Sequence, residues 1–199
     1  MSNTLQSIES IAQSGQTTMK EPVDPIQKEY EEGKQFFESG NLSQAAVALH
    51  NAFVGFEEKD DEIGIANASN MLGKVCLARG DNEIALKHFE RAFTICDKSN
   101  DRMSIVAVLK ELIKVYRALQ QNDKVITTCL DLLDHYQDNR DPQGTVTTLE
   151  EMAVTYASMH EKSKAADAYR TIASIHQNFK HEKMAAKFLK KADELNDES

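Results

Sequence analysis

The sequence predicts an all-α fold, a right-handed α-solenoid of four helix pairs followed by a C-terminal capping helix. Three observations predict it. Small and apolar residues recur every forty residues, aspartates that suit helix starts keep the same period, and turn residues are rare, with 8 Gly and 3 Pro in 199 residues. Because one helix pair cannot bury its own apolar side, a series of such pairs is stable only when the pairs stack on one another.

The repeat is clearest in two columns of equivalent positions. The first column lies in the first helix of each unit and holds Gly33, Gly73, Ile113 and Ala153. The second column lies in the partner helix and holds Leu49, Phe89, Cys129 and Tyr169. Small residues in the first column let the paired helices approach, and the bulky residues of the second fill the space between them.

Helix start and stop signals follow the same period. Asp61, Asp101 and Asp141 each precede an amphipathic run, where a carboxylate accepts hydrogen bonds from the free amides of the first turn. Gly40 and Gly80 suit left-handed C-caps. These signals, together with apolar spacings of three and four residues, place helices at 25–39, 42–58, 61–79, 82–98, 101–119, 122–138, 141–159, 162–178 and 181–196.

These elements form one predicted domain, residues 24–199, with repeats at 25–60, 61–100, 101–140 and 141–180 and a capping helix at 181–196. In the capping helix, Ala186, Leu189 and Ala192 extend an apolar column, and the surrounding lysines suit a solvated cap. An acidic partner or lipid headgroups are the alternative explanation of these lysines. Residues 1–23 are rich in Ser, Gln and Thr and are predicted to be a disordered tail. The alternative is a short docking helix in this tail.

The composition argues against several classes of function. The net charge of −9 argues against a generic nucleic-acid binder or a coat on anionic membranes. No apolar run approaches the roughly 18–20 residues that cross a bilayer, and the first eighteen residues lack a secretory signal. Cys76, Cys96 and Cys129 are too scattered for a disulfide framework or a zinc cluster. We therefore expect a cytoplasmic protein without an integral membrane segment.

The second unit carries the pattern of a known family, and its residues are Leu72-Gly73, Cys76, Gly80-Asp81, Ala85, Phe89 and Ala92. This pattern resembles the tetratricopeptide repeat. The forty-residue period resembles its long-helix subclass, found in kinesin light chains, receptor-linked polarity adaptors and bacterial peptide-responsive regulators. The third unit departs from the pattern with Ile113, Gln120, Val125 and Leu132. The resemblance implies that the first helices line a concave groove that holds an extended or helical peptide.

The exposed positions of those first helices give the candidate partner-binding residues. They are Tyr30, Lys34, Phe37, Asn67, Asn70, Met71, Lys74, Lys110, Lys114 and Arg117. Their lysine column suggests an acidic peptide or protein segment as the partner, and the two asparagines suit its backbone amides. The alternative is an ordinary solvated face. The two-carboxylate clamp of chaperone-binding members is absent, because the matching positions hold Tyr30, Lys34, Met71, Ala107 and Glu111.

No catalytic, metal or cofactor site is predicted. The six histidines form no i, i+4 pair, and no Gly-Lys-Ser or Gly-Lys-Thr phosphate loop occurs. We expect a non-catalytic interaction scaffold or adaptor. The alternatives are a peptide-responsive regulatory protein and a targeting co-chaperone. Weak self-association through the exposed end of the first unit also stays open.

Overall fold

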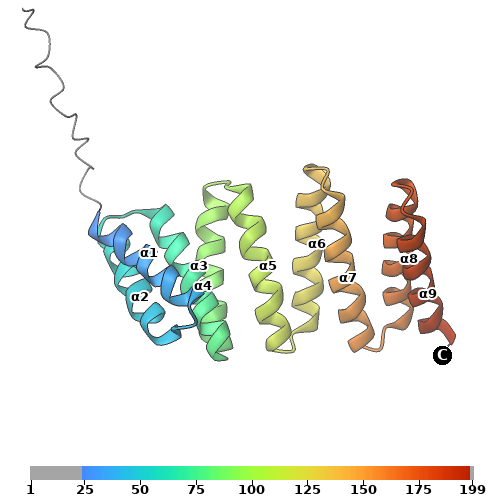
Figure 1. Ribbon diagram of the computed structural model, residues 1–199, viewed down its shortest axis with the longest axis horizontal. Helices are drawn as coiled ribbons and strands as arrows, with labels where there is room; N and C mark the ends of the chain where they lie inside the picture. The colour runs from blue at the N-terminus through green and yellow to red at the C-terminus, as the bar shows by residue number, and fades with distance from the viewer. Residues whose placement is uncertain (1–23, 198–199) are drawn as a thin grey trace, which may run out of the picture.

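The structure is a computed structural model that describes residues 24–197, and this part of the chain consists of nine α-helices without a strand (Figure 1). The helices are α1 Pro25–Glu38, α2 Leu42–Glu58, α3 Glu62–Arg79, α4 Asn82–Lys98, α5 Arg102–Ala118, α6 Asn122–Asp138, α7 Pro142–Ser158, α8 Lys162–Asn178 and α9 Glu182–Asp197. Each predicted helix end lies within one residue of the observed end, so the predicted α-solenoid is confirmed. The predicted disordered tail, residues 1–23, lies outside the described residues.

The helices stand side by side in a row that runs from α1 and α2 at one end to α8 and α9 at the other (Figure 1). Each helix packs on its neighbours in sequence. In addition, the backbone of α1 comes close to that of α3 and the backbone of α3 comes close to that of α5, whereas between residues 24 and 197 no two even-numbered helices approach as closely. The odd-numbered helices therefore form the inner side of the curve, and the even-numbered helices form the outer side.

Two kinds of helix start alternate along the row. Three odd-numbered helices begin at predicted aspartates, whose carboxylates accept from Gly64 at 2.9 Å, from Ser104 at 3.2 Å and from Gly144 at 2.9 Å. The even-numbered helices begin without a side-chain cap bond. The predicted aspartate caps are confirmed, and they mark the helices of the inner side.

A left-handed residue follows every helix from α1 to α8, and these residues lie twenty positions apart. Gly40 and Gly80 take this conformation with φ of 78° and 84°, as predicted. The six other positions are not glycine: Asp60, Asn100, Gln120, Arg140, His160 and Lys180, with φ between 52° and 61°. The next amide always bonds back into the last turn, as in Gln121 to the Tyr116 carbonyl at 2.9 Å. This bond holds a conformation that L side chains rarely adopt.

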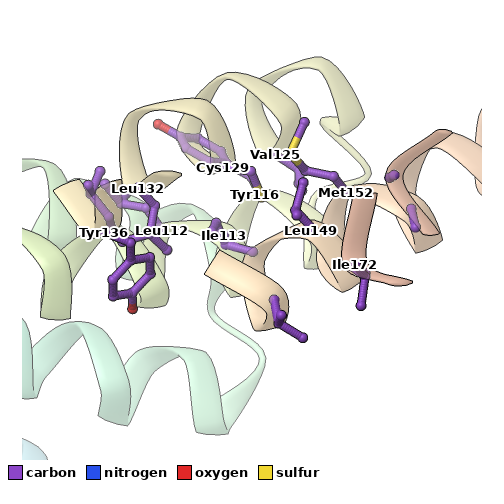
Figure 2. Close-up of a cluster of buried hydrophobic side chains, with 14 of the residues drawn as sticks. Leu112, Ile113, Tyr116, Val125, Cys129, Leu132, Tyr136, Leu149, Met152 and Ile172 are labelled. Atoms are coloured by element: carbon purple, nitrogen blue, oxygen red, sulfur yellow. The ribbon is translucent and has the colours of Figure 1, made fainter. Parts of the chain in front are cut away.

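The two predicted columns meet between paired helices. A Cβ built on Gly73 lies 2.6 Å from the Phe89 ring, and Phe89 is fully buried. In the third repeat Ile113 and Cys129 hold the equivalent positions inside the cluster of Figure 2. The predicted close approach of the helices is therefore confirmed.

The last helix corrects one prediction. Ala185, Phe188 and Ala192 are buried against α8, but Ala186 is exposed and Leu189 is 37% exposed. The predicted apolar column of Ala186 and Leu189 is therefore not a packed column. The physical reason is that, in the described part of the chain, the backbone of α9 lies against α8 alone, and α9 reaches α7 through the Lys191–Glu150 ion pair at 3.5 Å.

None of the helices between residues 24 and 197 combines the length and the apolarity that crossing a bilayer requires.

Candidate partner-binding groove

The inner side is hollowed between α3, α5 and α7 into a groove of about 620 Å³. Its apolar lining includes Val106, Ile113, Leu132 and Tyr136, the last three labelled in Figure 2. Its charged lining includes Lys74, Lys110, Glu111, Lys114, Arg117 and Glu151. Four of the ten predicted partner-binding residues, Lys74, Lys110, Lys114 and Arg117, thus lie in one groove.

Most cations of the groove are already paired within the protein. The Glu111 carboxylate lies 3.7 Å from the Lys74 ammonium and 2.9 Å from that of Lys114. The Arg117 guanidinium pairs with Glu151 of α7. Glu111 is the most enclosed of these groups, because its side chain is only 14% exposed. The basic strip expected from the sequence is therefore a set of ion pairs that joins three neighbouring inner helices.

Lys110 is the exception. Within residues 24–197 no carboxylate lies at ion-pair distance from its ammonium, which instead sits 5.5 Å from the centre of the Tyr136 ring. A cation over an aromatic face keeps its charge available to a further anion, since the ring neutralises none of it. Lys110 therefore places a positive charge directly beside the apolar lining of the groove.

The other six predicted residues lie outside this groove, on α1 and α3 of the first two repeats. Tyr30, Phe37 and Met71 are partly buried and pack against the core beneath them. The Tyr30 ring meets Phe56 edge to face at 6.2 Å between centres, and burial raises the pKa of the Tyr30 phenol. These three side chains therefore have a packing role.

Lys34, Asn67 and Asn70 differ in their exposure and in their hydrogen-bond partners. The Lys34 ammonium donates to Glu31 at 2.9 Å, and this hydrogen bond raises the pKa of Lys34. Asn67 is exposed. The Oδ1 atom of Asn70 is buried without a hydrogen-bond partner. Of the three, Asn70 is the side chain with an unsatisfied acceptor, although it is not part of the groove lining.

Sequence reasoning missed the role of Glu111 and Glu151. The i, i+3 spacing from Glu111 to Lys114 indicates an ion pair within one helix. The forty-residue period brings α3 and α7 beside α5, and no pattern in the sequence states how far the side chains of adjacent helices reach.

The cysteines are free and shielded. Burial raises the pKa of all three thiols, and that of Cys129 to about 12. A thiol that stays protonated is a poor nucleophile and behaves as a small apolar side chain. His176 and His181 lie near each other, with ring centres 5.7 Å apart. Over residues 24–197 there is no group of three or more His, Cys, Asp or Glu side chains that suits a metal ion.

Comparison with known proteins gives the following likenesses. No protein-family model matches the sequence. The protein KINESIN LIGHT CHAIN-RELATED 2 of Arabidopsis thaliana is 27% identical over 143 residues, which cover 69% of this chain and 19% of that protein. The crystal structure of apo RapI has a TM-score of 0.74 at 15% identity, over 87% of this chain and 64% of RapI.

A further structure is a signal-transduction ATPase (STAND) from Pyrococcus horikoshii with a tetratricopeptide repeat sensor. Its TM-score is 0.71 at 17% identity, over 87% of this chain and 29% of that one. The present chain thus spans less than two thirds of each of these three proteins. At such identities the structural likenesses establish the fold.

Proposed function

We propose that this chain, which folds as a tetratricopeptide-type α-solenoid, is a non-catalytic interaction scaffold. We propose further that it binds a segment of a partner protein in the groove between α3, α5 and α7. The observation that carries the proposal is the combination of an open apolar groove with one uncompensated cation, Lys110. Such a surface suits a peptide, because apolar side chains gain from burial while a charged group fixes the register.

The chemistry of the segment follows from the ion pairs. A strongly acidic peptide has to compete with Glu111 and Glu151 for Lys74, Lys114 and Arg117. An apolar residue beside a single carboxylate fits better, because Lys110 is the lysine of this groove that lacks a carboxylate partner among the described residues. We expect the apolar side chain against Tyr136 and the carboxylate at Lys110.

The test is a selection from a random peptide library displayed on phage, followed by affinity measurements on the selected peptides by fluorescence anisotropy. Peptides with an apolar residue next to Asp or Glu should be enriched. Lys110→Glu should weaken their binding by about tenfold or more, since it replaces an attraction by a repulsion. Lys74→Glu should have a smaller effect, because Lys74 already faces Glu111.

The matched control is Lys87→Glu, which makes the same charge change at an exposed position of the outer helix α4. Equal affinity for Lys110→Glu and Lys87→Glu would contradict the proposed site. Selected peptides without acidic residues would contradict the proposed chemistry of the partner.

A second candidate function is a sensor whose curvature changes when a peptide binds. It is favoured by the likeness to a protein whose tetratricopeptide repeats are described as a sensor. Small-angle scattering with and without a selected peptide separates the two functions. A scaffold keeps its radius of gyration, whereas a sensor changes it.

A further inference from the structure

A second hollow lies on the outer side of the solenoid, and we call it the outer hollow. It measures about 560 Å³ and lies between α4 and α6, with α5 as its floor. Its walls include the Phe93 ring and two carboxylates, Glu90 of α4 and Asp131 of α6. It shares no lining residue with the groove between α3, α5 and α7, so it is a separate surface.

The forty-residue period supplies an internal comparison for the outer hollow. The equivalent surface lies between α2 and α4, where Phe53 takes the place of the ring. Basic side chains surround this ring. The ring centres of His50 and His88 lie 6.5 Å and 6.4 Å from that of Phe53, and the Arg91 guanidinium lies 4.7 Å from it. Arg91 also pairs with Glu57 of α2. An arginine that lies over an aromatic ring and pairs with a carboxylate thus covers this surface within the protein.

The outer hollow keeps the ring but reverses the charge around it. Forty positions after the three basic residues stand Glu90, Thr128 and Asp131. The third equivalent surface, between α6 and α8, has Leu133 in place of the ring and no charged residue at the three other positions. Of the three surfaces, the outer hollow is therefore the one that combines an aromatic ring with carboxylates and lacks the arginine.

The two carboxylates of the outer hollow have no counter-charge of their own. Glu90 and Asp131 are both exposed, and over residues 24–197 neither lies at ion-pair distance from a Lys, Arg or His side chain. Burial and the neighbouring Asp134 carboxylate raise the pKa of Asp131, while His135 acts in the opposite direction. A cation that enters the outer hollow therefore gains two unpaired carboxylates.

Three threonine hydroxyls around the outer hollow have no proton left to give. Those of Thr94, Thr127 and Thr128 donate to main-chain carbonyls of their own helices at 2.8, 3.0 and 2.8 Å. Because a hydroxyl has one proton, these oxygens remain as acceptors. Among the described residues, Lys124 is the only cation of the lining, and its ammonium lies 5.1 Å from the centre of the Tyr116 ring. Apart from Lys124, the polar side chains of the outer hollow thus offer acceptors to a ligand.

A guanidinium group has the properties that this surface selects. It is flat and stacks on a ring, it is positively charged, and it carries five donors and no acceptor. We propose that the outer hollow binds an arginine side chain of a partner protein. The guanidinium lies over Phe93 and donates to Glu90 and Asp131, as Arg91 lies over Phe53 one repeat earlier. The contact uses neither Lys110 nor the inner groove, so it is independent of the proposed function.

The test is nuclear magnetic resonance of the ¹⁵N-labelled full-length protein, titrated with the acetylated and amidated peptide Gly-Arg-Gly. The amides of residues 90–94 and 127–131 should shift and saturate in roughly the millimolar range, as suits a single side chain. The same peptide with lysine should bind about threefold or more weakly, because an ammonium does not stack flat on the ring. The peptide with citrulline, which has the shape of arginine without its charge, should cause no such shift.

Charge and ring are tested separately. Glu90→Gln/Asp131→Asn should weaken binding of the arginine peptide by about fivefold or more, since it removes both ion pairs. The matched control is Glu83→Gln/Asp123→Asn, which removes the same two charges from the first turns of the same two helices. This control should bind like the wild type. Phe93→Leu should remove the preference for arginine over lysine, because the stacking surface is then gone.

Four results would overturn the proposal. One is the absence of shifts at residues 90–94 and 127–131 up to about 20 mM arginine peptide, well above the expected range. Another is equal binding of the citrulline peptide. The third is equal weakening by the charge variant and its matched control, which would trace the attraction to the net charge of the protein. The fourth is a shift of the same amides with protein concentration alone, which would show that a second copy of this chain fills the outer hollow.

Discussion

The second and third repeats have the same two-helix arrangement, but they place the large residue of the core pair on different helices. In the second repeat Gly73 lies against Phe89, and a Cβ at Gly73 would come within 2.6 Å of that ring. In the third repeat the large residue is Ile113, and the position across from it holds Cys129; both are buried. The two repeats thus exchange the large and the small partner between the paired helices.

The exchange shows that the interface constrains the summed volume of the two positions. Protein interiors are packed at nearly constant density, so one position gives up what the other occupies. The third unit departs from the family pattern at Ile113, and Cys129 compensates for that departure in the partner helix. Substitutions at these positions and at their neighbours therefore test how the two repeats differ.

The largest effect is expected from removing the large residue of the second repeat. Phe89→Ala should lower the free energy of unfolding by about 3–5 kcal/mol, because a fully buried ring leaves a cavity. Cys129→Ala at the equivalent position of the third repeat should cost only about 1 kcal/mol. Urea unfolding followed by circular dichroism gives both values. The matched control is Phe179→Ala, since Phe179 is 54% exposed and its loss should change little. Equal costs at positions 89 and 129 would contradict the exchange of volume.

The exchange itself is testable by moving the third-repeat pair into the second repeat. Gly73→Ile alone should cost about 2–3 kcal/mol through overpacking, and Phe89→Cys alone about 3 kcal/mol through a cavity. The double variant should lose at least 1 kcal/mol less than the sum, because the isoleucine then occupies the space that the ring leaves. Additive costs in this double-mutant cycle would show that the two positions do not share one volume.

Replacing the aspartate at a helix start is expected to change the free energy of unfolding by a smaller amount. Asp101 begins α5 and accepts from the Ser104 amide, whereas Asp81 begins α4 without a cap bond. Asp101→Ala should cost about 0.5–1 kcal/mol at neutral pH, and Asp81→Ala should cost less. Hydrogen bonds from Ser104 hold the pKa of Asp101 below its ordinary value of 3.8.

This depressed pKa fixes the sign of the pH dependence. The stabilisation by Asp101 is complete above the unfolded pKa of 3.8 and is lost as the pH falls through the lower folded pKa. The cost of Asp101→Ala should therefore shrink when unfolding is measured at about pH 3 in place of pH 7. A cost that grows on acidification would contradict the assigned cap.

The smallest effect is expected in the groove. Lys74 of the second repeat and Lys114 of the third share the carboxylate of Glu111, whereas the second repeat has Met71 at the equivalent position. Glu111→Gln should cost about 0.5–1 kcal/mol, because it leaves two lysines without a counter-charge, and the cost should fall as salt rises. Met71→Gln is the control for the second repeat. A cost for Glu111→Gln that does not depend on salt would argue against the ion pairs.

The nine helices between residues 25 and 197, the aspartate caps and the order of the repeats can be predicted from the sequence, because these features depend on local spacing and on a period that no insertion interrupts. The sequence also placed Lys74, Lys110, Lys114 and Arg117 on one face. Which of these cations lacks a carboxylate partner among the described residues depends on the tertiary structure, since Glu111 of α5 reaches Lys74 of α3 and Glu151 of α7 reaches Arg117 of α5. The same holds for the left-handed turns at residues such as Gln120 and Arg140, where packing and the closing hydrogen bond impose a conformation that the side chains do not favour. The uncovered Leu189 is a further case, because exposure depends on what lies beside a helix and not on the pattern along it.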